Sequence, residues 1–556
     1  MISQPHFSSI YVIVCHLERC GGDRPSPVYS AVLDYHSCQD IQIGMPKLNR
    51  QRQPPYPTGP QALLVTIQAE DLAYVHLALG WRMPERVLDL TIEFWNMING
   101  RNVPCGPSLA GALIWFGLPA APAITRGDAP DQVRRLLRLL ARLFERMSSH
   151  LDWGRALLRG RYLMAVTRIE ATGIPVDEPT LAGLSKNWRT VQTNLIAGID
   201  DSFGFYRGYQ FQVDAFEDWL ATRGIDWPRN AFGRLDLSDD VFKERARAHP
   251  DVRPLKELRA TIGAFQPGQV LIGRDGRNRT PMRPFASRTG RNQPSAKASI
   301  LGGPAWIRFL VRPDPGKGLA LIDWCQQEFS IAAALSGDTA MQAAYQAGDP
   351  YVAFAVTAGA APEGATAVTH PDVRAQFKAC ALGVQYGMGA RTLARMLNTP
   401  LADAERLLER HRRIFPRFWH WSDAIEAEGL LHGRLHSVFG WQVAVGADAN
   451  PRFLRNFPMQ ANGAEMLRLA CCLTTEAGIR VCATLHDALL IEANLEDLEK
   501  AIADTQRLMA EASAIVLDGF ELRSEVRCVR YPGRLGDERG RVIWSTIEKL
   551  MAEGRS

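Results

Sequence analysis

The sequence lacks the cysteine pairs that hold a zinc ion or form a redox dithiol. Its ten cysteines are scattered, and no two of them have C-x-x-C spacing. We therefore expect neither a zinc site nor a thioredoxin-like motif. Several of these cysteines lie in apolar segments, where a free thiol behaves as a small hydrophobic side chain. This usage is typical of a reducing compartment and predicts a cytoplasmic protein.

Long hydrophobic runs and a dominant charge are also missing. No segment approaches the ~20 apolar residues that cross a membrane, and the N-terminus lacks the features of a signal peptide. We therefore expect no membrane partner. Lysine and arginine number 64 against 59 acidic residues, a net charge of +5. This mild basic excess permits a polyanionic partner without requiring one.

The first part of the chain has the pattern of an α/β domain. Apolar strands are expected first and a helix follows them, and shorter helices come next. A boundary is expected near residue 155, and the length of 556 residues leaves room for further domains. The expected strands are 8–17, 28–35, 41–43 and 62–67, and the expected helices are 69–79, 92–98 and 107–116.

Two basic segments admit two interpretations each. Residues 131–147 form an amphipathic helix with leucines at three-to-four spacing and arginines elsewhere. Residues 275–297 are a loop-rich segment dense in Arg, Gly, Ser and Pro. Either segment could contact phosphates. Otherwise the first is a surface helix and the second is an exposed linker.

A short apolar strand at 318–322 ends on a carboxylate, Asp323, and Glu328 follows about one turn later. An unpaired carboxylate at the end of a buried strand is costly. Asp323 therefore either caps the next helix or binds something positive.

A second motif lies on an expected helix over 371–387. Arg374, Lys378, Leu382 and Tyr386 follow one slowly turning face of it. Two cations, an apolar side chain and a ring in this order suit a nucleoside triphosphate lying along the helix. The alternative is a basic surface helix.

A third motif lies in the apolar segment 480–492, which reads as a hairpin with His486 and Asp487 at its tip. Alone, such a pair is more often structural than metal-binding. Together with Asp323, however, Asp487 could bridge two Mg²⁺ ions, with Mn²⁺ as a substitute. The implied reaction is nucleotidyl transfer, in which a 3′-hydroxyl attacks an α-phosphate and pyrophosphate leaves.

The motifs resemble those of the family A DNA polymerases, the class of bacterial DNA polymerase I. The resemblance covers roughly residues 156–532. It includes Thr289-Gly290-Arg291, Arg452-x3-Asn456-x3-Gln460 and residues 162–177. The three main motifs are motif A (Asp323-x-x-Gln326-x-Glu328), motif B (Arg374-x3-Lys378-x7-Tyr386-Gly387) and motif C (His486-Asp487).

The resemblance implies an α/β (α+β) right-hand polymerase fold after an RNase H-like, 3′–5′ exonuclease-type domain. The exonuclease-like domain is expected at 1–155 and the polymerase domain at 156–556. Within the latter, the resemblance implies a thumb at about 176–275, a palm at about 276–345 and 432–556, and fingers at about 346–431.

The family also implies site residues and partners. The expected partners are primer-template DNA and dNTPs, bound by a monomer in the bacterial cytoplasm, at the nucleoid or during phage infection. The expected catalytic residues are Asp323, Asp487 and Lys378, the last as proton donor to pyrophosphate, and the expected metal ligands are Asp323, Asp487 and Trp324. The expected dNTP contacts are Arg374, Lys378, Leu382, Tyr386, Gln326, Tyr351 and Glu328, the last as a gate against the ribose 2′-hydroxyl. The expected DNA contacts are Arg291, Arg452, Asn456, Gln460 and His486.

The sequence departs from the family pattern in the polymerase motifs. Ala488 replaces the usual glutamate of motif C, which is the least essential of the three acids. Leu382 replaces an aromatic residue and is also met in phage-type members. Tyr351 stands near the place of a triphosphate-contacting histidine.

The exonuclease motif is also altered. The first strand carries only a displaced Glu18 where Asp-x-Glu is expected, so we predict an exonuclease-like domain without proofreading. We also expect no 5′-nuclease domain. The remaining acids without a matching spacing are Glu70, Asp71, Asp89, Asp128 and Asp131.

Three other functions stay open. A single-subunit RNA polymerase of phage type shares this palm, although Glu328 opposes that hypothesis. A non-catalytic DNA-binding relative is compatible with Ala488. An active exonuclease would require acids that the sequence pattern does not identify. Whether a polymerase of this kind serves repair or replication is left open by the sequence.

Overall fold

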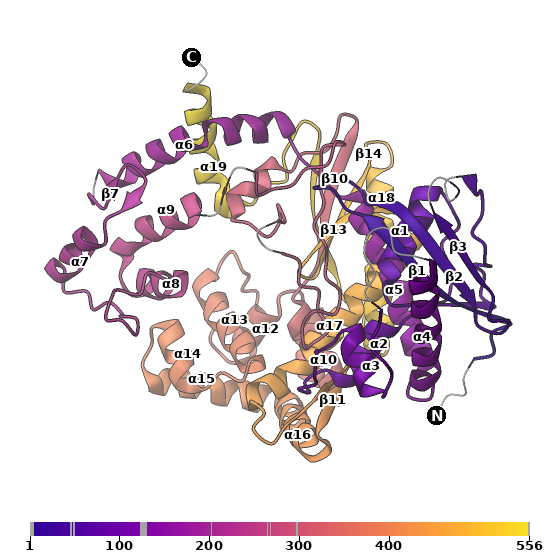
Figure 1. Ribbon diagram of the computed structural model, residues 1–556. Helices are drawn as coiled ribbons and strands as arrows, with labels where there is room; N and C mark the ends of the chain where they lie inside the picture. The colour runs from indigo at the N-terminus through magenta and orange to yellow at the C-terminus, as the bar shows by residue number, and fades with distance from the viewer. Residues whose placement is uncertain are drawn as a thin grey trace.

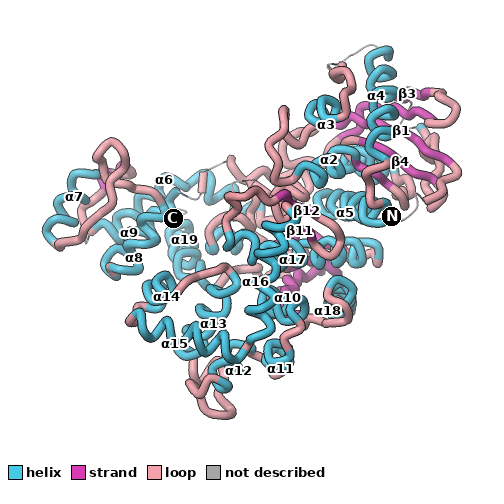
Figure 2. Tube along the Cα trace, turned by 90° about the horizontal axis from the view of Figure 1, so that it is seen from below, coloured by secondary structure: helices cyan, strands magenta, loops and turns pink. Residues whose placement is uncertain are grey.

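The computed structural model describes residues 5–44, 47, 50–122, 130–201, 203–263, 265–266, 268–295 and 298–553 (Figure 1). An α/β unit at the N-terminus lies at one end, and a helical arm containing α6–α9 lies at the other (Figures 1 and 2). The second β-sheet and the helices packed on it lie between them. The fold combines helices and sheets as an α/β fold, as the sequence predicts.

The N-terminal unit is built on a sheet with strand order β3-β2-β1-β4-β5. β1 pairs antiparallel with β2 and parallel with β4. The side chains of β1 are largely buried because helices cover the sheet. The strands are β1 (Ser9–Glu18), β2 (Ser26–Asp34), β3 (Asp40–Gly44), β4 (Ala62–Thr66) and β5 (Val87–Asp89). The helices are α1 (Ala69–Leu79), α2 (Leu90–Ile98), α3 (Leu109–Trp115) and α4 (Pro130–Ser148).

Helix α4 is the basic helix that the sequence predicts. Its leucines, among them Leu137 and Leu140, are buried in the core with β1 and β2. Arg134 on the same helix forms an ion pair with Asp40 of β3, with a nitrogen–oxygen distance of 2.9 Å. The leucine spacing therefore reflects packing against the sheet, as expected of an amphipathic surface helix.

Helix α5 (Trp153–Thr172) joins the N-terminal unit to the rest of the chain. It packs against α1 and β5 on one side and against α17 and β13 on the other. Gly160 permits this close approach, because a Cβ there would lie 1.9 Å from the carbonyl oxygen of Val87. The expected boundary near residue 155 falls in the first turn of this helix.

The second sheet, which we call the palm sheet, has strand order β13-β14-β10-β15, and all its neighbours are antiparallel. Its strands are β10 (Lys317–Trp324), β13 (Arg480–Leu485), β14 (Ala488–Asn494) and β15 (Ser524–Arg530). Helices α10 (Gln327–Ser336), α17 (Pro451–Glu476) and α18 (Leu498–Val516) surround it. The expected hairpin around His486 is therefore confirmed.

A helical subdomain follows α10 in the chain. Its core is aromatic and includes Phe354, Phe377 and Phe415. Its elements are α11 (Thr339–Gln346), α12 (Pro350–Thr357), α13 (Pro371–Gln385), α14 (Ala390–Leu397), α15 (Leu401–Ile414), α16 (Pro416–His432), β11 (Arg434–His436) and β12 (Gln442–Ala444).

The helical arm has an aromatic core of its own, which contains Phe205, Phe216, Trp227 and Phe242. At its base, α19 packs against α6 and η3, where Trp544 stacks on Phe309 with ring centroids 5.6 Å apart. The arm and its base contain β6 (Ile174–Pro175), α6 (Glu178–Asp200), β7 (Tyr206–Arg207), β8 (Gln210–Phe211), α7 (Val213–Thr222), α8 (Asp239–Ala248), η2 (Pro250–Val252), α9 (Arg253–Gly263), β9 (Arg277–Asn278), η3 (Ala305–Leu310), η4 (Glu538–Gly540) and α19 (Arg541–Glu553).

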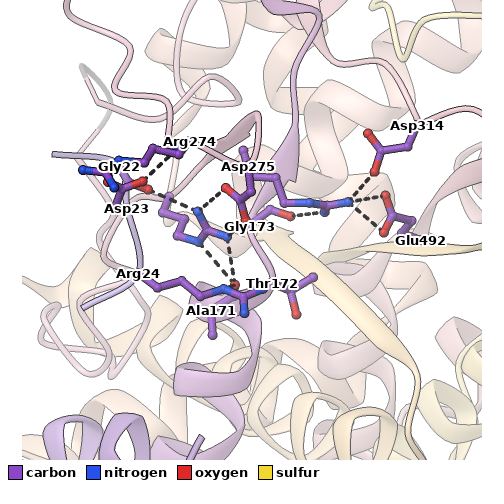
Figure 3. A network of polar contacts seen from close by, with 12 residues as sticks. Gly22, Asp23, Arg24, Ala171, Thr172, Gly173, Arg274, Asp275, Asp314 and Glu492 are labelled. Atoms are coloured by element: carbon purple, nitrogen blue, oxygen red, sulfur yellow. Dashed lines mark hydrogen bonds and ion pairs between the residues drawn. The ribbon is translucent and has the colours of Figure 1, made fainter. Parts of the chain in front are cut away.

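Segments far apart in sequence meet at Arg277, whose partners Gly173, Asp314 and Glu492 are labelled in Figure 3. Its guanidinium group donates to the carbonyl oxygen of Gly173 and to the carboxylates of Asp314 and Glu492, at distances of 2.7–3.0 Å. Arg277 is buried, and the Glu492 side chain is 0% exposed. A buried charge needs such partners, so this ion pair fixes β9 against β14.

Within the described residues, no helix combines the length and apolar character needed to cross a membrane.

Candidate active site

Two aspartates meet at one end of the palm sheet. Asp323 is the penultimate residue of β10 and is paired with Ala488 at the start of β14. Leu485 and Ala488 pair directly, so His486 and Asp487 form the two-residue turn between β13 and β14. His486 has a φ of +57°, a left-handed conformation that such a turn requires. Strand pairing therefore brings Asp487 beside Asp323.

The environment of Asp323 favours the binding of a cation. Burial, together with the negative charges of Asp487 and Glu525, raises the pKa of the Asp323 carboxyl to about 7. Its Oδ1 atom is buried and has no hydrogen-bond partner. A buried oxygen without a partner is costly, and a divalent cation would satisfy it. The residues present therefore fit a metal site.

Few side chains are placed to act as ligands to a metal ion at this site. Within the described ranges, no group of three or more His, Cys, Asp and Glu side chains is placed to hold a metal. An ion bound to Asp323 and Asp487 would need water or substrate phosphates to complete its coordination, as Mg²⁺ usually does. The indole nitrogen of Trp324 carries a hydrogen and can only donate, so the residue could offer only its backbone oxygen to an ion.

The structure excludes the N-cap interpretation of Asp323. Helix α10 begins at Gln327, and its N-cap residue is Gln326, which has a φ of +47° and makes no side-chain capping bond. Asp323 lies in the strand and not at the helix terminus. The Oε1 atom of Gln326 is buried without a partner.

Glu525 is a member of this site that the sequence analysis missed. It lies on β15 directly opposite Asp323, on the side away from β14. It also lines a cavity of about 580 Å³ with Asp323 and Asp487. Arginines 308, 527 and 539 line the same cavity. A predicted strand over 524–530 would have included Glu525. No local feature of the sequence, however, shows that this strand pairs with β10 in the register that places Glu525 opposite Asp323.

Glu328, Tyr386 and Gln460 form a closed set of hydrogen bonds. The Tyr386 hydroxyl donates to Glu328 Oε1 at 2.8 Å. Gln460 Nε2 donates to the same carboxylate and to the Tyr386 hydroxyl, the latter at 3.1 Å. Burial and the Glu328 charge raise the pKa of Tyr386 to about 12, so the hydroxyl keeps its proton. Residues from α10, α13 and α17 thus meet at one point.

The expected triphosphate contacts lie together on α12 and α13. The Arg374 guanidinium carbon and Lys378 Nζ lie 5.6 and 5.8 Å from the centre of the Tyr351 ring. Arg374 also forms an ion pair with Asp349, which caps α12 through the amides of Tyr351 and Val352. Leu382 is half-buried further along α13. Arg374 and Lys378 therefore lie on one face of α13, as predicted, and the binding of a triphosphate by this face stays a prediction.

Of the residues expected to contact the duplex, two line one cavity and two others lie against the C-terminal end of α13. Arg291 and His486 line a cavity of about 370 Å³, and Arg291 Nε lies 3.4 Å from the Gln460 carbonyl oxygen. Arg452 packs on Gly387, where a Cβ would lie 2.9 Å from its Cγ. Asn456 Nδ2 lies 3.5 Å from the carbonyl oxygen of Gln385.

Several acids of the N-terminal unit have structural partners. Asp89 accepts hydrogen bonds from the amides of Ala69, Thr91 and Ile92, so it joins the starts of α1 and α2. Burial nevertheless raises its pKa to about 6.

The other acids singled out by sequence are only partly separated, because Glu70 and Asp71 of α1 lie close enough to Asp89 for its charge to act on Glu70. Asp71 pairs with Arg19, and Asp131 pairs with Arg134. Glu18 ends β1, and burial raises the pKa of Glu70 to about 8. Asp128 lies outside the described residues.

The palm sheet and the helices around it form an α/β polymerase fold. A solved structure titled "POL domain of Pol1 from M. smegmatis complex with DNA primer-template and dNTP" matches this fold with a TM-score of 0.72. The two chains are 16% identical, and the match covers 94% of each.

Sequence comparison finds similarity to DNA polymerases. Residues 304–528, about two-fifths of the chain, match the model of DNA polymerase family A. It is 26% identical over 415 residues to the thermostable DNA polymerase I of Thermus thermophilus, covering 69% of this chain and 49% of the relative. With DNA polymerase I of Aquifex aeolicus it is 23% identical over 384 residues, 65% of this chain and 64% of the relative. The chain thus spans about half the length of the Thermus relatives.

Proposed function

We propose that this protein is a template-directed DNA polymerase that adds dNTPs to a primer 3′-hydroxyl. The observation that carries the proposal is the meeting of Asp323 and Asp487 at the end of the palm sheet, with an oxygen of Asp323 buried and without a partner. In this proposal, Asp323, Asp487 and the backbone oxygen of Trp324 hold two divalent ions, Mg²⁺ or Mn²⁺. Such ions, when bound, activate the attacking hydroxyl and stabilise charge on the leaving oxygen.

The cationic face of α13 has the charges needed to hold the triphosphate. Arg374 and Lys378 neutralise phosphate charge, and their position over the Tyr351 ring limits their freedom. Lys378 donates a proton to the pyrophosphate as it leaves. Leu382 contacts the sugar, and Tyr386 lies at the templating position.

Glu328 serves as the gate against ribonucleotides. Its carboxylate is held by Tyr386 and Gln460, so it has little freedom to make room for a 2′-hydroxyl. Gln326, at the start of α10, contacts the incoming nucleotide beside it. A gate held by partners discriminates better than a mobile side chain, because moving it breaks hydrogen bonds.

The duplex occupies the face lined by Arg291, Arg452, Asn456, Gln460 and His486. The minor groove presents similar acceptors in every base pair, so these contacts check the shape of the pair and not its sequence. His486 lies against the primer terminus, beside the acids that it precedes in the turn.

We further propose that the N-terminal unit, residues 1–155, does not proofread. Asp89 serves as a helix cap, and Asp71 is engaged in an ion pair. The polymerase part, 156–556, then has its thumb at about 176–275, its palm at about 276–345 and 432–556, and its fingers at about 346–431. The enzyme acts as a monomer in the cytoplasm.

Primer extension with Mg²⁺ and four dNTPs tests the proposal. The expected result is full-length product from matched primers and no excision of a mismatched terminus. Incubation of a single-stranded oligonucleotide without nucleotides tests for exonuclease activity. Long products from ribonucleotides alone would instead support a single-subunit RNA polymerase.

Ala488 favours a second candidate, a non-catalytic DNA-binding relative, because an acid usual at this position is missing. That candidate predicts tight primer-template binding with no extension, and an Asp323→Ala variant that behaves as the wild type does. Extension that is lost in Asp323→Ala excludes it.

A further inference from the structure

The end of helix α2 is joined to the palm region by two buried asparagines. Asn99, 6% exposed, donates both amide hydrogens of its Nδ2 atom, to the carbonyl oxygens of Arg288 and Gln442, each at 2.7 Å. The carbonyl oxygen of Asn99 accepts from the Ala444 amide at 2.8 Å. One side chain therefore links the N-terminal unit to a loop and to strand β12.

Asn96, one turn earlier, makes a matching pair of bonds to the same hairpin. Its Oδ1 atom accepts from the Gln442 amide at 2.9 Å, and its Nδ2 atom donates to the Gly440 carbonyl at 3.2 Å. The buried ion pair between Glu93 and Arg159 holds α2 to α5 behind these contacts. The hairpin is thus attached to a rigid support.

The loop that Asn99 reaches is held from its other side by the palm. The Arg288 carbonyl also accepts from Trp441 Nε1 at 3.1 Å. The Trp441 ring lies under Gly290, where a Cβ would approach it to 3.0 Å, and the φ of +76° at Gly290 suits glycine. Arg468 of α17 donates to the Gly290 carbonyl at 2.7 Å. Hydrogen bonds therefore hold the loop at two positions, Arg288 and Gly290.

This loop ends at Arg291, three residues beyond the carbonyl that Asn99 holds. The Arg291 amide donates to Ser287 Oγ at 2.7 Å, which closes the loop on itself. The Arg291 side chain lines the 370 Å³ cavity with His486. A shift of the Arg288 carbonyl would therefore move Arg291 relative to the primer terminus.

We propose that Asn99 is a positioning residue for primer-terminus recognition, through which the N-terminal unit sets the place of Arg291. The inference rests on the proposed polymerase function and extends it, because it gives this unit a part in DNA recognition that needs no proofreading chemistry. Both hydrogens of the amide are used, so its removal leaves two buried carbonyl groups each short of a donor.

The test compares Asn99→Asp, which keeps the shape and removes the amide hydrogens, with Asn99→Ala. Asn102→Ala, at an exposed position on the same segment, is the matched control. Single-nucleotide incorporation is followed over a range of primer-template concentrations, with matched and mismatched termini, so that the Kd for DNA and the maximal rate are separated. Thermal unfolding of each variant is measured in parallel.

Both Asn99 variants are expected to bind primer-template about tenfold more weakly, the effect of losing about 1.4 kcal/mol of hydrogen bonding. They should also lose discrimination against a mismatched terminus, while the maximal rate on matched DNA stays within about twofold because Asp323 and Asp487 are untouched. Trp441→Phe, which removes the other donor to the Arg288 carbonyl, should shift the Kd in the same direction.

Unchanged DNA affinity and discrimination in both Asn99 variants would overturn the inference, as would a lowered Tm with no change in either. These outcomes differ from failure of the proposed function, in which the wild-type protein itself does not extend a primer. If the wild type extends primers and the Asn99 variants match it, only the positioning role is lost.

Discussion

Asp323 of β10 and Glu525 of β15 are direct backbone partners across the palm sheet. Ala488 of β14 is the partner of Asp323 on the other side. Direct partners in an antiparallel sheet project to the same face. Asp323 therefore has no carboxylate beside it on the β14 side, where Ala488 stands, and has the carboxylate of Glu525 on the β15 side. All three residues line the same cavity.

Glu525→Gln is expected to weaken divalent-ion binding about threefold to tenfold, because one negative charge near the site is lost. Titration of Mn²⁺ against the protein without DNA, followed by electron paramagnetic resonance, measures this directly. Glu521→Gln, at an exposed position on the preceding segment, is the control. Equal Mn²⁺ affinity in Glu525→Gln and wild type would remove Glu525 from the site.

Asp487→Ala is expected to lower primer extension by about 10³-fold or more, since a metal ligand accounts for several kcal/mol of transition-state stabilisation. Binding of primer-template, measured by fluorescence anisotropy, should remain within about threefold because the proposed duplex contacts other than His486 lie on other elements. Extension that persists at the wild-type rate would contradict the metal assignment.

Glu328→Ala is expected to raise the use of ribonucleotides relative to deoxyribonucleotides by about 10–100-fold, because the side chain proposed to oppose a 2′-hydroxyl is gone. The ratio of kcat/KM for a matched rNTP and dNTP measures it. Gln460→Ala removes a donor to the same carboxylate but leaves the gate in place, so its effect should be smaller. An equal ratio in Glu328→Ala and wild type would show that another residue selects the sugar.

Glu170 of α5 gives stability a pH dependence. Burial raises its pKa from the ordinary 4.5 to about 7, while its carboxylate accepts the Met282 amide at 2.7 Å. At pH values between about 4.5 and about 7, Glu170 is protonated in the folded state and ionised in the unfolded state. The contribution of Glu170 to the free energy of unfolding therefore falls as the pH rises through this interval.

Glu170→Gln keeps an acceptor for that amide and cannot ionise. Its free energy of unfolding should therefore decline less over this interval, by about 1–3 kcal/mol, than that of the wild type. Chemical unfolding at several pH values measures the difference. If the free energy of unfolding changes equally with pH in both proteins, a group other than Glu170 causes the pH dependence.

Local signals account for what the sequence predicts correctly. The apolar run before Asp323, the glycine after Tyr386 and the alternation around His486 each mark an element, and the structure has a strand, a helix and a hairpin there. Arg374 and Lys378 also share one face of α13, because a spacing of four residues keeps helical side chains together, whereas their contact with Tyr351 of α12 has no local signal. The roles of these residues toward metals and DNA remain predictions.

Residues that depend on long-range register could not be predicted. Glu525 is 202 positions from Asp323 in sequence, and only the pairing of β10 with β15 makes them neighbours. Asn99 donates to carbonyl groups almost 200 and more than 340 residues away, and nothing in its own segment indicates them. The capping hypothesis for Asp323 was wrong because the chain turns once more, at Gln326, before α10 begins.

The position of Arg277 has a consequence for how the chain is made. Its partners are Gly173, Asp314 and Glu492. Glu492 is the last of the three to be synthesised, after nearly nine-tenths of this sequence. Until then the guanidinium group lacks the buried carboxylate it pairs with in the finished protein, and β9 cannot dock on β14. The N-terminal unit, whose sheet is complete by Asp89, can form much earlier during synthesis. Ribosome-bound chains that end before Glu492 should therefore resist proteolysis in the first 90 residues while cleavage continues around residue 277.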